Sequence, residues 1–287
     1  MAAGARAPGS GVDVITFIGG GNMAAALIAG LTKKGWKADA IHVADIDAAA
    51  RQRLARDFKV HVHENPVDAL AGSECVVLAV KPQQLQEVAR KLSPQLRDKL
   101  VITIAAGIRC SDLARWLRGH ARLVRAMPNT PALALAGVTG LYAPQTVSVG
   151  DRATASRILG GAGVTVWVDR EEHMDAVTAI SGSGPAYVFY FIEALQEAAL
   201  DLRLDRAAAR TLALETFSGA VKLALESTES IEKLRERVTS PGGTTERGIA
   251  ELERQRVKAA ILLAAQAAFE RSRDLGDALG RDDAGAD

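Results

Sequence analysis

Val14–Ala24, which reads VITFIGGGNMA, is the stretch that decides the fold. Its first five residues form a β-branched and aromatic run typical of a buried strand, and a helical pattern begins near Asn22. The turn between them has the form G-x-G-x-x-A. Gly19 permits a tight turn, Gly21 lets the backbone approach a phosphate, and Ala24 keeps the helix close to the strand. This arrangement indicates a pyrophosphate site for a dinucleotide, with an ordinary glycine-rich turn as the alternative.

Short apolar runs and helical patterns alternate after this stretch. The predicted strands cover residues 12–18, 41–44, 60–62, 75–80, 100–104, 123–126, 138–142 and 164–168. The predicted helices between them cover residues 23–34, 47–58, 85–92, 111–117 and 152–159. This order predicts an α/β fold with a parallel sheet covered by helices. We therefore expect a dinucleotide-binding domain at residues 12–169, preceded by a mobile tail at residues 1–11.

The pattern changes after about Asp169, where strand-like runs end and long helical stretches rich in Ala and Leu begin. A second, all-helical domain is therefore expected at residues 170–287. Within it, Ala186–Leu202 and Ala207–Leu225 are apolar over more than one helix face. A helical partner from another subunit would cover the additional apolar surface, and burial within the same domain is the alternative.

The amino-acid composition limits the classes of partner that the protein can be expected to bind. The chain has 48% hydrophobic residues, and its 35 Lys and Arg nearly balance its 34 Asp and Glu. Such a balance gives no electrostatic reason to expect a nucleic-acid or membrane partner, so small-molecule chemistry is favoured. No uncharged apolar stretch reaches about 20 residues, and the first residues lack a signal sequence, so the cytoplasm is expected. Cys75 and Cys110 lack the spacing of a metal site or a redox pair.

Asp45 follows the second predicted strand, where the adenosine ribose of a dinucleotide is expected. A carboxylate accepts hydrogen bonds from a ribose diol and repels a 2′-phosphate, so Asp45 favours NADH over NADPH. Arg51 and Arg53 on the next helix can partly offset that repulsion. Asp45 is alternatively an N-cap for the helix that begins near Asp47, and the two roles are compatible.

A second site loop is expected in the helical part, at Ser240–Thr245, which reads SPGGTT. Gly242 and Gly243 can adopt backbone angles that are closed to other residues. The helix that continues from Thr244 presents free N–H groups suited to a small carboxylate, and the Thr245 hydroxyl can hydrogen-bond a substrate nitrogen. A helix-capping turn without a ligand is the alternative.

The scarcity of Lys and His side chains that could act as a general base further limits the possible reactions. Dehydrogenases that act on hydroxyl groups usually need a Lys or His base, yet no lysine lies between Lys99 and Lys222, and His173 is the only histidine of the helical part. An imine needs only orientation and hydride, because it can arrive already protonated.

A segment of small residues, Ser181–Tyr187 (SGSGPAY), interrupts a helical pattern that starts near Glu171. Small residues there allow close approach of a cofactor or a neighbouring chain. Tight packing within the domain is the alternative.

These motifs together resemble the Δ1-pyrroline-5-carboxylate reductase family from about Val14 to Leu275. The resemblance rests on the order and spacing of six segments, which read FIGGGNM at 17–23, AVKP at 79–82, AAG at 105–107, RAMPNTP at 125–131, SGSGPAY at 181–187 and SPGGTT at 240–245. It implies an N-terminal Rossmann-type domain and a helical dimerisation and substrate domain. It also implies a homodimer that assembles into a larger ring such as a decamer, with the active site expected between subunits.

The resemblance implies reduction of (S)-1-pyrroline-5-carboxylate to L-proline, the last step of proline biosynthesis, with hydride from NADPH or NADH and without a metal. The implied cofactor-binding residues are Ile18, Gly19, Gly20, Gly21, Asn22, Met23, Asp45, Asn65, Ala79, Val80, Lys81, Pro82, Ala105 and Ala106. The implied substrate-binding residues are Glu171, Ser240, Gly242, Gly243, Thr244 and Thr245. Thr245 is the implied catalytic residue, because its family counterpart lies near the ring nitrogen.

Two departures from the family pattern are visible. Asp45 stands where NADPH-using relatives often carry Ser or Thr, and Thr228–Ile231 replaces a His-Pro pair found in many members.

Two other functions are considered. A hydroxyacid-type dehydrogenase is disfavoured by the lysine missing from the first long helix, and a non-catalytic dinucleotide-binding scaffold is disfavoured by the intact Ser240–Thr245 loop.

Overall fold

The computed structural model describes residues 14–281, which pack into two compact units. The first unit contains the chain up to Gly182 and again from Ala268, and the second unit contains Ser183–Ala267. The first unit therefore extends past the boundary expected at residue 169 and includes the end of the chain's last helix. The tail expected at residues 1–11 lies outside the described residues. Within residues 14–281, every helix is too short or too polar to span a membrane.

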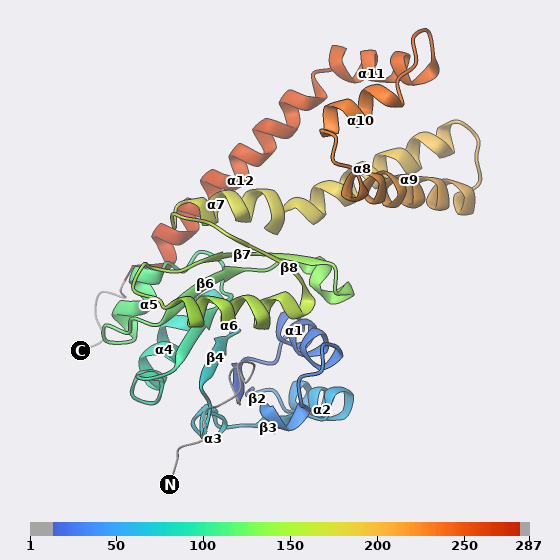
Figure 1. The fold of residues 1–287 in the computed structure, drawn as a ribbon. Coiled ribbons are helices and arrows are strands. Elements are labelled where there is room, and N and C mark those ends of the chain that lie inside the picture. Colours follow the sequence, from blue (N-terminus) through green and yellow to red (C-terminus); the bar gives the residue numbers. More distant parts are fainter. Residues whose placement is uncertain (1–13, 282–287) are drawn as a thin grey trace. The chain divides into compact units, whose positions relative to one another are not determined.

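The described part of the first unit contains one eight-stranded sheet with the order β3-β2-β1-β4-β5-β6-β7-β8 (Figure 1). The strands are β1 (Ile15–Ile18), β2 (Ile41–Ala44), β3 (His61–His63), β4 (Cys75–Leu78), β5 (Leu100–Thr103), β6 (Leu123–Met127), β7 (Gly137–Tyr142) and β8 (Gly163–Trp167). All eight predicted strands are present. The first six follow the order of a dinucleotide-binding sheet, which brings the ends of β1, β2 and β4 together.

The expectation of a wholly parallel sheet is wrong at one pair. β6 and β7 are antiparallel, whereas the other neighbours are parallel. The connection from residue 128 to residue 136 contains only the 3₁₀ turn Thr130–Ala134. Such a segment is too short to cross over the sheet as a parallel connection requires, so the chain reverses direction.

Helices cover both faces of this sheet (Figure 1). The helices of the first unit are α1 (Asn22–Lys33), α2 (Ala48–Phe58), α3 (Pro66–Ala69), α4 (Pro82–Leu96), α5 (Cys110–Trp116), α6 (Val149–Leu159) and α7 (His173–Val177). Successive strand residues point to opposite faces. Phe17 of β1 therefore packs with Leu27 of α1 in one core, and Ile18 packs with Leu85 of α4 in the other. Burial on both faces explains the continuous apolar runs in the central strands.

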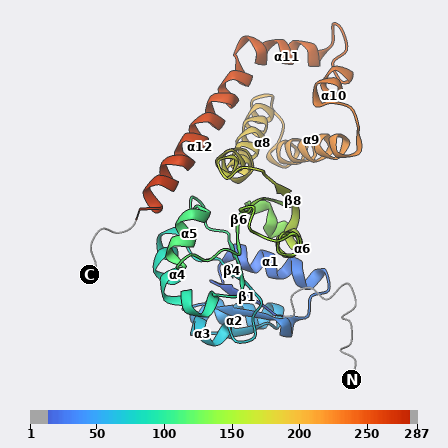
Figure 2. The ribbon, with the colours of Figure 1, turned by 60° about the vertical axis from the view of Figure 1, so that its left-hand side comes forward.

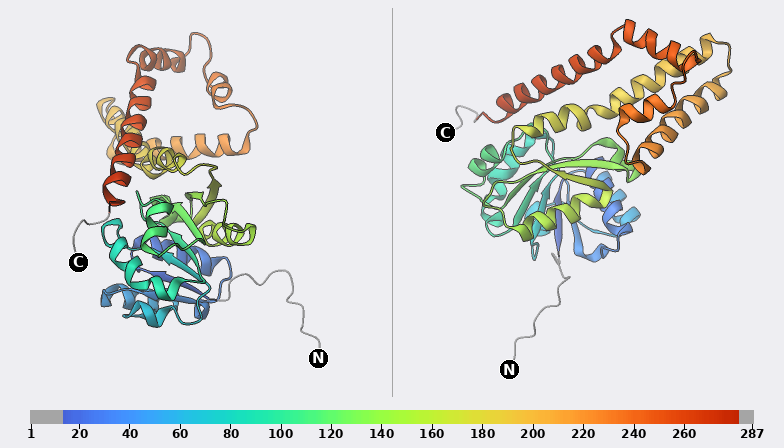
Figure 3. Two further views of the ribbon diagram at one scale, coloured as in Figure 1. Left: turned by 90° about the vertical axis from the view of Figure 1, so that its left-hand side faces the viewer. Right: turned by 45° about the horizontal axis from the view of Figure 1, so that its top comes forward.

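The second unit is helical, as expected. Its helices are α8 (Gly184–Asp201), α9 (Arg206–Glu226), α10 (Ile231–Arg237), α11 (Thr244–Arg254) and the first part of α12 (Val257–Leu279). Figures 2 and 3 show α8 and α9 as neighbouring antiparallel helices. Large apolar side chains remain uncovered on this unit, with exposed fractions of 65% for Phe189, 71% for Tyr190 and 70% for Leu263. Exposed apolar area of this kind is typical of a subunit interface.

Candidate active site

The glycine loop lies where the sequence predicts it, between β1 and α1. Gly19 has φ +102, and a Cβ atom there would lie 2.7 Å from the carbonyl oxygen of Ala79. Gly19 must therefore be glycine for both its conformation and its close approach to the chain after β4. Gly21 differs, because a Cβ atom there would meet nothing within 4 Å. The exposed Gly21 is the N-cap of α1, so the free space beside it adjoins the unpaired N–H groups of a helix N-terminus.

Asp45 connects the end of β2 to this loop. One carboxylate oxygen, Oδ2, accepts a hydrogen bond of 2.6 Å from the backbone N–H of Gly20, and Oδ1 accepts one of 2.8 Å from the N–H of Asp47. The N-cap of α2 is Asp47 rather than Asp45, since the Asp47 side chain accepts from Ala49. Each Asp45 oxygen retains lone pairs, so a ribose diol can bind the same carboxylate.

Arg51 and Arg53 of α2 both donate hydrogen bonds to neighbouring groups of the protein. Arg51 donates to the backbone oxygens of Asp45 and Ile46 and pairs with Glu64 at 3.1 Å. Arg53 donates from Nη2 to the Gly20 oxygen at 3.1 Å, and its buried Nε has no hydrogen-bond partner among the described residues. Neither guanidinium is therefore wholly free to offset the charge of Asp45.

A cavity of about 790 Å³ opens beside the glycine loop, large enough for a cofactor. It is lined by Ile18, Gly19, Gly20, Gly21, Ala44, Asp45, Ile46, Asp47, Ala49, Ala50, Arg53, Glu64, Pro66, Ala79, Val80, Lys81, Gln84, Glu87, Val88, Lys91 and Leu92. The cavity joins the ends of β1, β2 and β4, which are far apart in sequence. The free space beside Gly21 and the unpartnered Arg53 Nε fit a phosphate-bearing dinucleotide.

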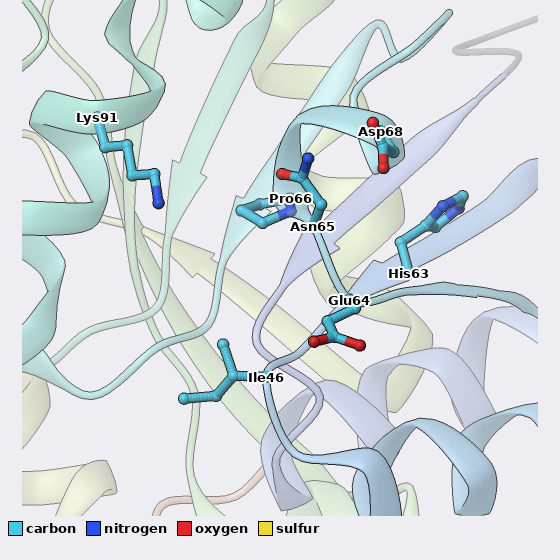
Figure 4. A pocket seen from close by; sticks show the side chains of 7 residues that line it. All are labelled: Ile46, His63, Glu64, Asn65, Pro66, Asp68 and Lys91. Atoms are coloured by element: carbon cyan, nitrogen blue, oxygen red, sulfur yellow. The ribbon is translucent and has the colours of Figure 1, made fainter.

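Asn65 lies at a smaller neighbouring pocket. Figure 4 shows this pocket, in which Lys91 of α4 points toward Asn65 and Pro66. Asn65 is also the N-cap of α3, because its Oδ1 accepts a hydrogen bond of 3.0 Å from the Val67 N–H. Asn65 is exposed. The structure thus places Asn65 in a pocket that adjoins the large cavity, with its side-chain oxygen used for capping.

Ala79–Pro82 follows β4 and enters α4. Ala79 donates its N–H to the Ile18 oxygen at 2.7 Å, which ties this segment to β1, and Pro82 occupies the first turn of α4. Lys81 is the N-cap of α4 and lines the cavity. Ala105 and Ala106 follow β5, with Ala105 buried and its N–H donated to the Thr103 hydroxyl at 3.2 Å. Neither Ala105 nor Ala106 lines the cavity.

Glu171 is engaged in a buried ion-pair network. Its Oε1 accepts from the Cys110 N–H at 2.7 Å and from Arg125 at 3.2 Å. Arg125, with a side chain only 5% exposed, also lies 3.9 Å from Asp175, which accepts 2.7 Å from the Ser272 hydroxyl of α12. Burial, and next the charge of Glu171, raises the pKa of the Cys110 thiol. These contacts give Glu171 a structural role in the first unit. The contact of Glu171 with substrate remains a prediction.

Asn129 joins two of the quoted motifs, a connection that sequence reasoning missed. Its Nδ2 donates to the Ser181 oxygen at 3.0 Å, and its Oδ1 accepts from the Val138 N–H at 2.9 Å. Met127 of the same motif would collide with a Cβ at Gly182. The RAMPNTP segment therefore anchors the first two residues of the SGSGPAY segment, and the amide side chain of Asn129 inside the motif was the available signal.

The SPGGTT loop belongs to the second unit and precedes α11. Gly242 has φ +71 and donates its N–H to Glu246 at 2.8 Å, while Gly243 donates to the Ser240 oxygen at 3.0 Å and forms the N-cap. The helix-capping turn considered as an alternative is therefore present. Thr244 and Thr245 are exposed in the first turn of α11. No hydrogen bond engages the Thr245 hydroxyl within the described chain.

Side chains on α4 were also missed. Gln84, Glu87 and Lys91 line the large cavity, although sequence reasoning assigned only Ala79–Pro82. The three recur at helical spacing on the polar face of an amphipathic helix, which was the available signal. Among residues 14–281, no group of three or more His, Cys, Asp or Glu side chains is arranged to hold a metal ion.

Two family models match the chain. One, described as pyrroline-5-carboxylate reductase dimerisation, matches residues 171–275. The other, described as NADP oxidoreductase coenzyme F420-dependent, matches residues 14–107. The first match covers the helical part with its uncovered apolar faces, and the second covers the glycine loop and Asp45.

Relatives and solved structures agree with the family models. The chain is 43% identical to a pyrroline-5-carboxylate reductase of Pseudomonas aeruginosa, over 93% of this chain and 98% of the relative. A structure of a pyrroline-5-carboxylate reductase from Coxiella burnetii superposes with a TM-score of 0.88 at 39% identity, covering 92% of this chain and 98% of that one. A pyrroline carboxylate reductase of Plasmodium falciparum with NADP bound has a TM-score of 0.82 at 29% identity, covering 93% and 100%.

Proposed function

The chain belongs to the pyrroline-5-carboxylate reductase family and is an NAD(P)H-dependent oxidoreductase of proline biosynthesis, and from that premise we propose which residues perform the reduction. Reduction of the cyclic imine adds a hydride to C5 and leaves a proton on nitrogen, giving L-proline. The bound reduced nicotinamide supplies the hydride from its C4. The protein's residues hold the two rings face to face and orient the imine, which requires no covalent intermediate and no metal.

Ile18–Met23 is proposed to hold the cofactor pyrophosphate. The support is local: the space beside Gly21 is free, and the exposed N-terminus of α1 offers unpaired N–H groups at the positive end of the helix dipole. Asn22 and Met23 begin that helix, while Gly19 and Gly20 give the loop its shape. The buried Arg53 Nε adds a cation at the cavity wall.

Asp45 is proposed to bind the adenosine ribose, with Asn65 nearby, and to favour NADH over NADPH. The observation that carries this preference is the fixed position of the Asp45 carboxylate between the N–H groups of Gly20 and Asp47. A carboxylate held there faces the ribose with no freedom to swing away from a 2′-phosphate. Arg51 is already paired with Glu64, which limits its capacity to neutralise Asp45.

Ala79, Val80, Lys81 and Pro82 are proposed to continue the cofactor site toward the nicotinamide, followed by Ala105 and Ala106. Small residues after β4 and β5 allow a flat ring to approach the backbone. Lys81 is proposed to face the cofactor rather than to act in proton transfer, because it lines the cavity beside the glycine loop.

The imino acid is proposed to bind at the SPGGTT loop of the second unit, through Ser240, Gly242, Gly243, Thr244 and Thr245. The first turn of the eleven-residue helix α11 exposes backbone N–H groups that suit the substrate carboxylate. The exposed Thr245 hydroxyl is proposed to hydrogen-bond the ring nitrogen and is the catalytic residue. Glu171 is kept as a weaker substrate-side proposal, since Arg125 and the Cys110 N–H already engage it.

Thr245→Val tests this assignment, because it keeps the side-chain volume and removes the hydroxyl. We expect turnover with pyrroline-5-carboxylate to fall about a hundredfold, the lower range for loss of a proton-transfer group, while NADH binding is retained. Thr245→Ser keeps the hydroxyl and is expected to retain most of the turnover. Unchanged turnover in Thr245→Val removes Thr245 from the mechanism.

The chain forms a homodimer through its dimerisation domain at residues 171–275. We further propose that these dimers assemble into a larger ring such as a decamer, for which the uncovered apolar side chains of the helical unit provide support. Sedimentation velocity distinguishes a dimer from a decamer by mass.

The cytoplasmic location remains a prediction, which cell fractionation tests.

A further inference from the structure

Three histidines lie together at the β3 edge of the sheet, and one of them, His63, lines the smaller pocket that adjoins the large cavity. His42 of β2 is in register with His61 of β3, and His63 lies two residues further on the same face. The His42 ring lies 4.9 Å from the His61 ring and 5.1 Å from the His63 ring, measured between centroids, and it is stacked on the latter. Nδ1 of His42 and Nε2 of His63 are 3.1 Å apart. No proposed catalytic or binding role uses this cluster.

The contact between His42 and His63 limits the number of protons that the cluster can hold. One nitrogen must donate and the other must accept, so the pair can share one additional proton but not two. Burial, and next the charges of His61 and His63, lowers the pKa of His42 below its ordinary value of 6.5. The native strand pairing therefore favours an uncharged His42 imidazole.

Other elements add little compensating charge around His42. On its β1 side, Thr16 is in register with His42, and its hydroxyl donates to Ala69 of α3. Glu64 after β3 and Asp68 of α3 line the small pocket together with His63, and Figure 4 shows the His63 ring directed away from Lys91. The charges that shift the His42 pKa come from His61 and His63 alone.

The cluster is linked to the glycine loop by two hydrogen bonds in series. The backbone N–H of Asp45 donates to the His63 oxygen at 3.1 Å, which extends the pairing of β2 with β3 by one residue. The Asp45 carboxylate then accepts from the Gly20 N–H at 2.6 Å. Separation of β3 from β2 would remove the backbone support of the residue that fixes the glycine loop.

We propose that the His42, His61 and His63 cluster is a proton-operated switch for dinucleotide binding. When the cluster gains protons, the positively charged rings repel one another and β3 loosens from β2. Asp45 and the glycine loop then lose their fixed geometry, and cofactor affinity falls. The inference rests on the proposed binding of the dinucleotide in the cavity beside the glycine loop.

The direction of the pH effect follows from the lowered pKa. In the loosened form His42 binds a proton near its ordinary pKa of 6.5, whereas in the native pairing its lowered pKa delays protonation to lower pH. The native pairing is therefore fully stable above that value and weakens as pH falls below it. From about pH 7.5 to about pH 5.5 we therefore expect the Kd for NADH to rise by at least roughly threefold, and to stay constant above about pH 7.5.

The test measures the Kd for NADH by fluorescence across this pH range, with the full-length protein. NADH is the probe because it lacks the 2′-phosphate, which itself titrates near this range. His42→Gln and His63→Gln are expected to flatten the dependence, and the exposed His61 should contribute less when replaced by Gln. His120→Gln is the matched control: burial also lowers the pKa of His120, but its ring bonds the Lys99 oxygen and takes no part in the pairing of β2 with β3.

An equal rise of the Kd in the wild type and in the His42→Gln, His63→Gln double variant overturns the switch. A failure to bind NADH or NADPH at any pH instead refutes the proposed cofactor site. Amide hydrogen exchange at residues 61–63 of the ligand-free protein then decides the switch. Opening that increases at acid pH in the wild type and not in the double variant supports it, and identical opening in both overturns it.

Discussion

The carboxylate of Asp45 accepts a hydrogen bond of 2.6 Å from the backbone N–H of Gly20, which lies 25 residues earlier in the chain. The residue that faces the adenosine ribose in our proposal thus also fixes the loop proposed to hold the pyrophosphate. A substitution at Asp45 therefore alters loop geometry unless the new side chain keeps an oxygen in the same place. Asn keeps that oxygen and removes the charge, so Asp45→Asn separates the two effects.

Gly19→Ala is expected to destabilise the protein, because Gly19 has φ +102 and a Cβ atom would lie 2.7 Å from the Ala79 oxygen. The backbone strain corresponds to about 1–3 kcal/mol of unfolding free energy. Urea denaturation of the ligand-free protein measures it. A midpoint equal to that of the wild type would show that the loop relaxes without cost.

Gly21→Ala is expected to leave stability nearly unchanged, since its Cβ would meet nothing within 4 Å in the protein. The added methyl group would instead occupy space proposed for the pyrophosphate, so the Kd for NADH should rise about tenfold or more. Isothermal titration with NADH checks this prediction. Unaltered affinity would place the pyrophosphate elsewhere.

Arg125→Met is expected to lower the unfolding free energy by about 3–5 kcal/mol, the usual cost of leaving buried carboxylates without their cation. Glu171 and Asp175 both depend on Arg125, whose side chain is 5% exposed. Ser272→Ala removes only the hydroxyl that bonds Asp175, with an expected cost of about 1 kcal/mol. Chemical denaturation measures the loss of unfolding free energy in each variant. Equal losses in Arg125→Met and Ser272→Ala would contradict the central position of Arg125 in this network.

Asp151 is expected to contribute to acid stability. Its carboxylate binds two nitrogens of Arg122, at 2.8 and 3.1 Å, and the hydrogen bond from Arg122 lowers the pKa of Asp151 below its ordinary value of 3.8. A carboxyl with a lowered folded-state pKa stabilises the fold above the ordinary value, and this contribution is lost as pH falls through the folded-state pKa. Thermal unfolding should show a smaller loss for Asp151→Asn than for the wild type between about pH 5 and about pH 3. Parallel curves would remove this ion pair from acid stability.

Much of the first unit could be predicted from sequence, because its elements are specified locally. Continuous apolar runs such as Cys75–Leu78 marked strands buried on both faces, and the glycine loop marked the start of α1. The reversal between β6 and β7 was missed because the length of one connection, rather than the strand patterns, decides it.

Long-range packing accounts for the remaining differences. The last part of α12 belongs to the first unit, where Ser272 bonds Asp175 and Arg109 pairs with Asp277. Helical periodicity cannot show which unit a helix end joins. The ion pair of Glu171 with Arg125 was missed for the same reason, since the two residues are 46 positions apart in sequence.

The most direct test of the account is a comparison of kcat/KM for NADH and NADPH with pyrroline-5-carboxylate, in the wild type and in Asp45→Asn. The account predicts oxidation of both cofactors with a higher kcat/KM for NADH in the wild type. It also predicts that Asp45→Asn reduces this preference about tenfold by removing the charge opposite a 2′-phosphate. A wild-type preference for NADPH, or a ratio unchanged in Asp45→Asn, would contradict the role of Asp45, and no oxidation of either cofactor would contradict the proposed site as a whole.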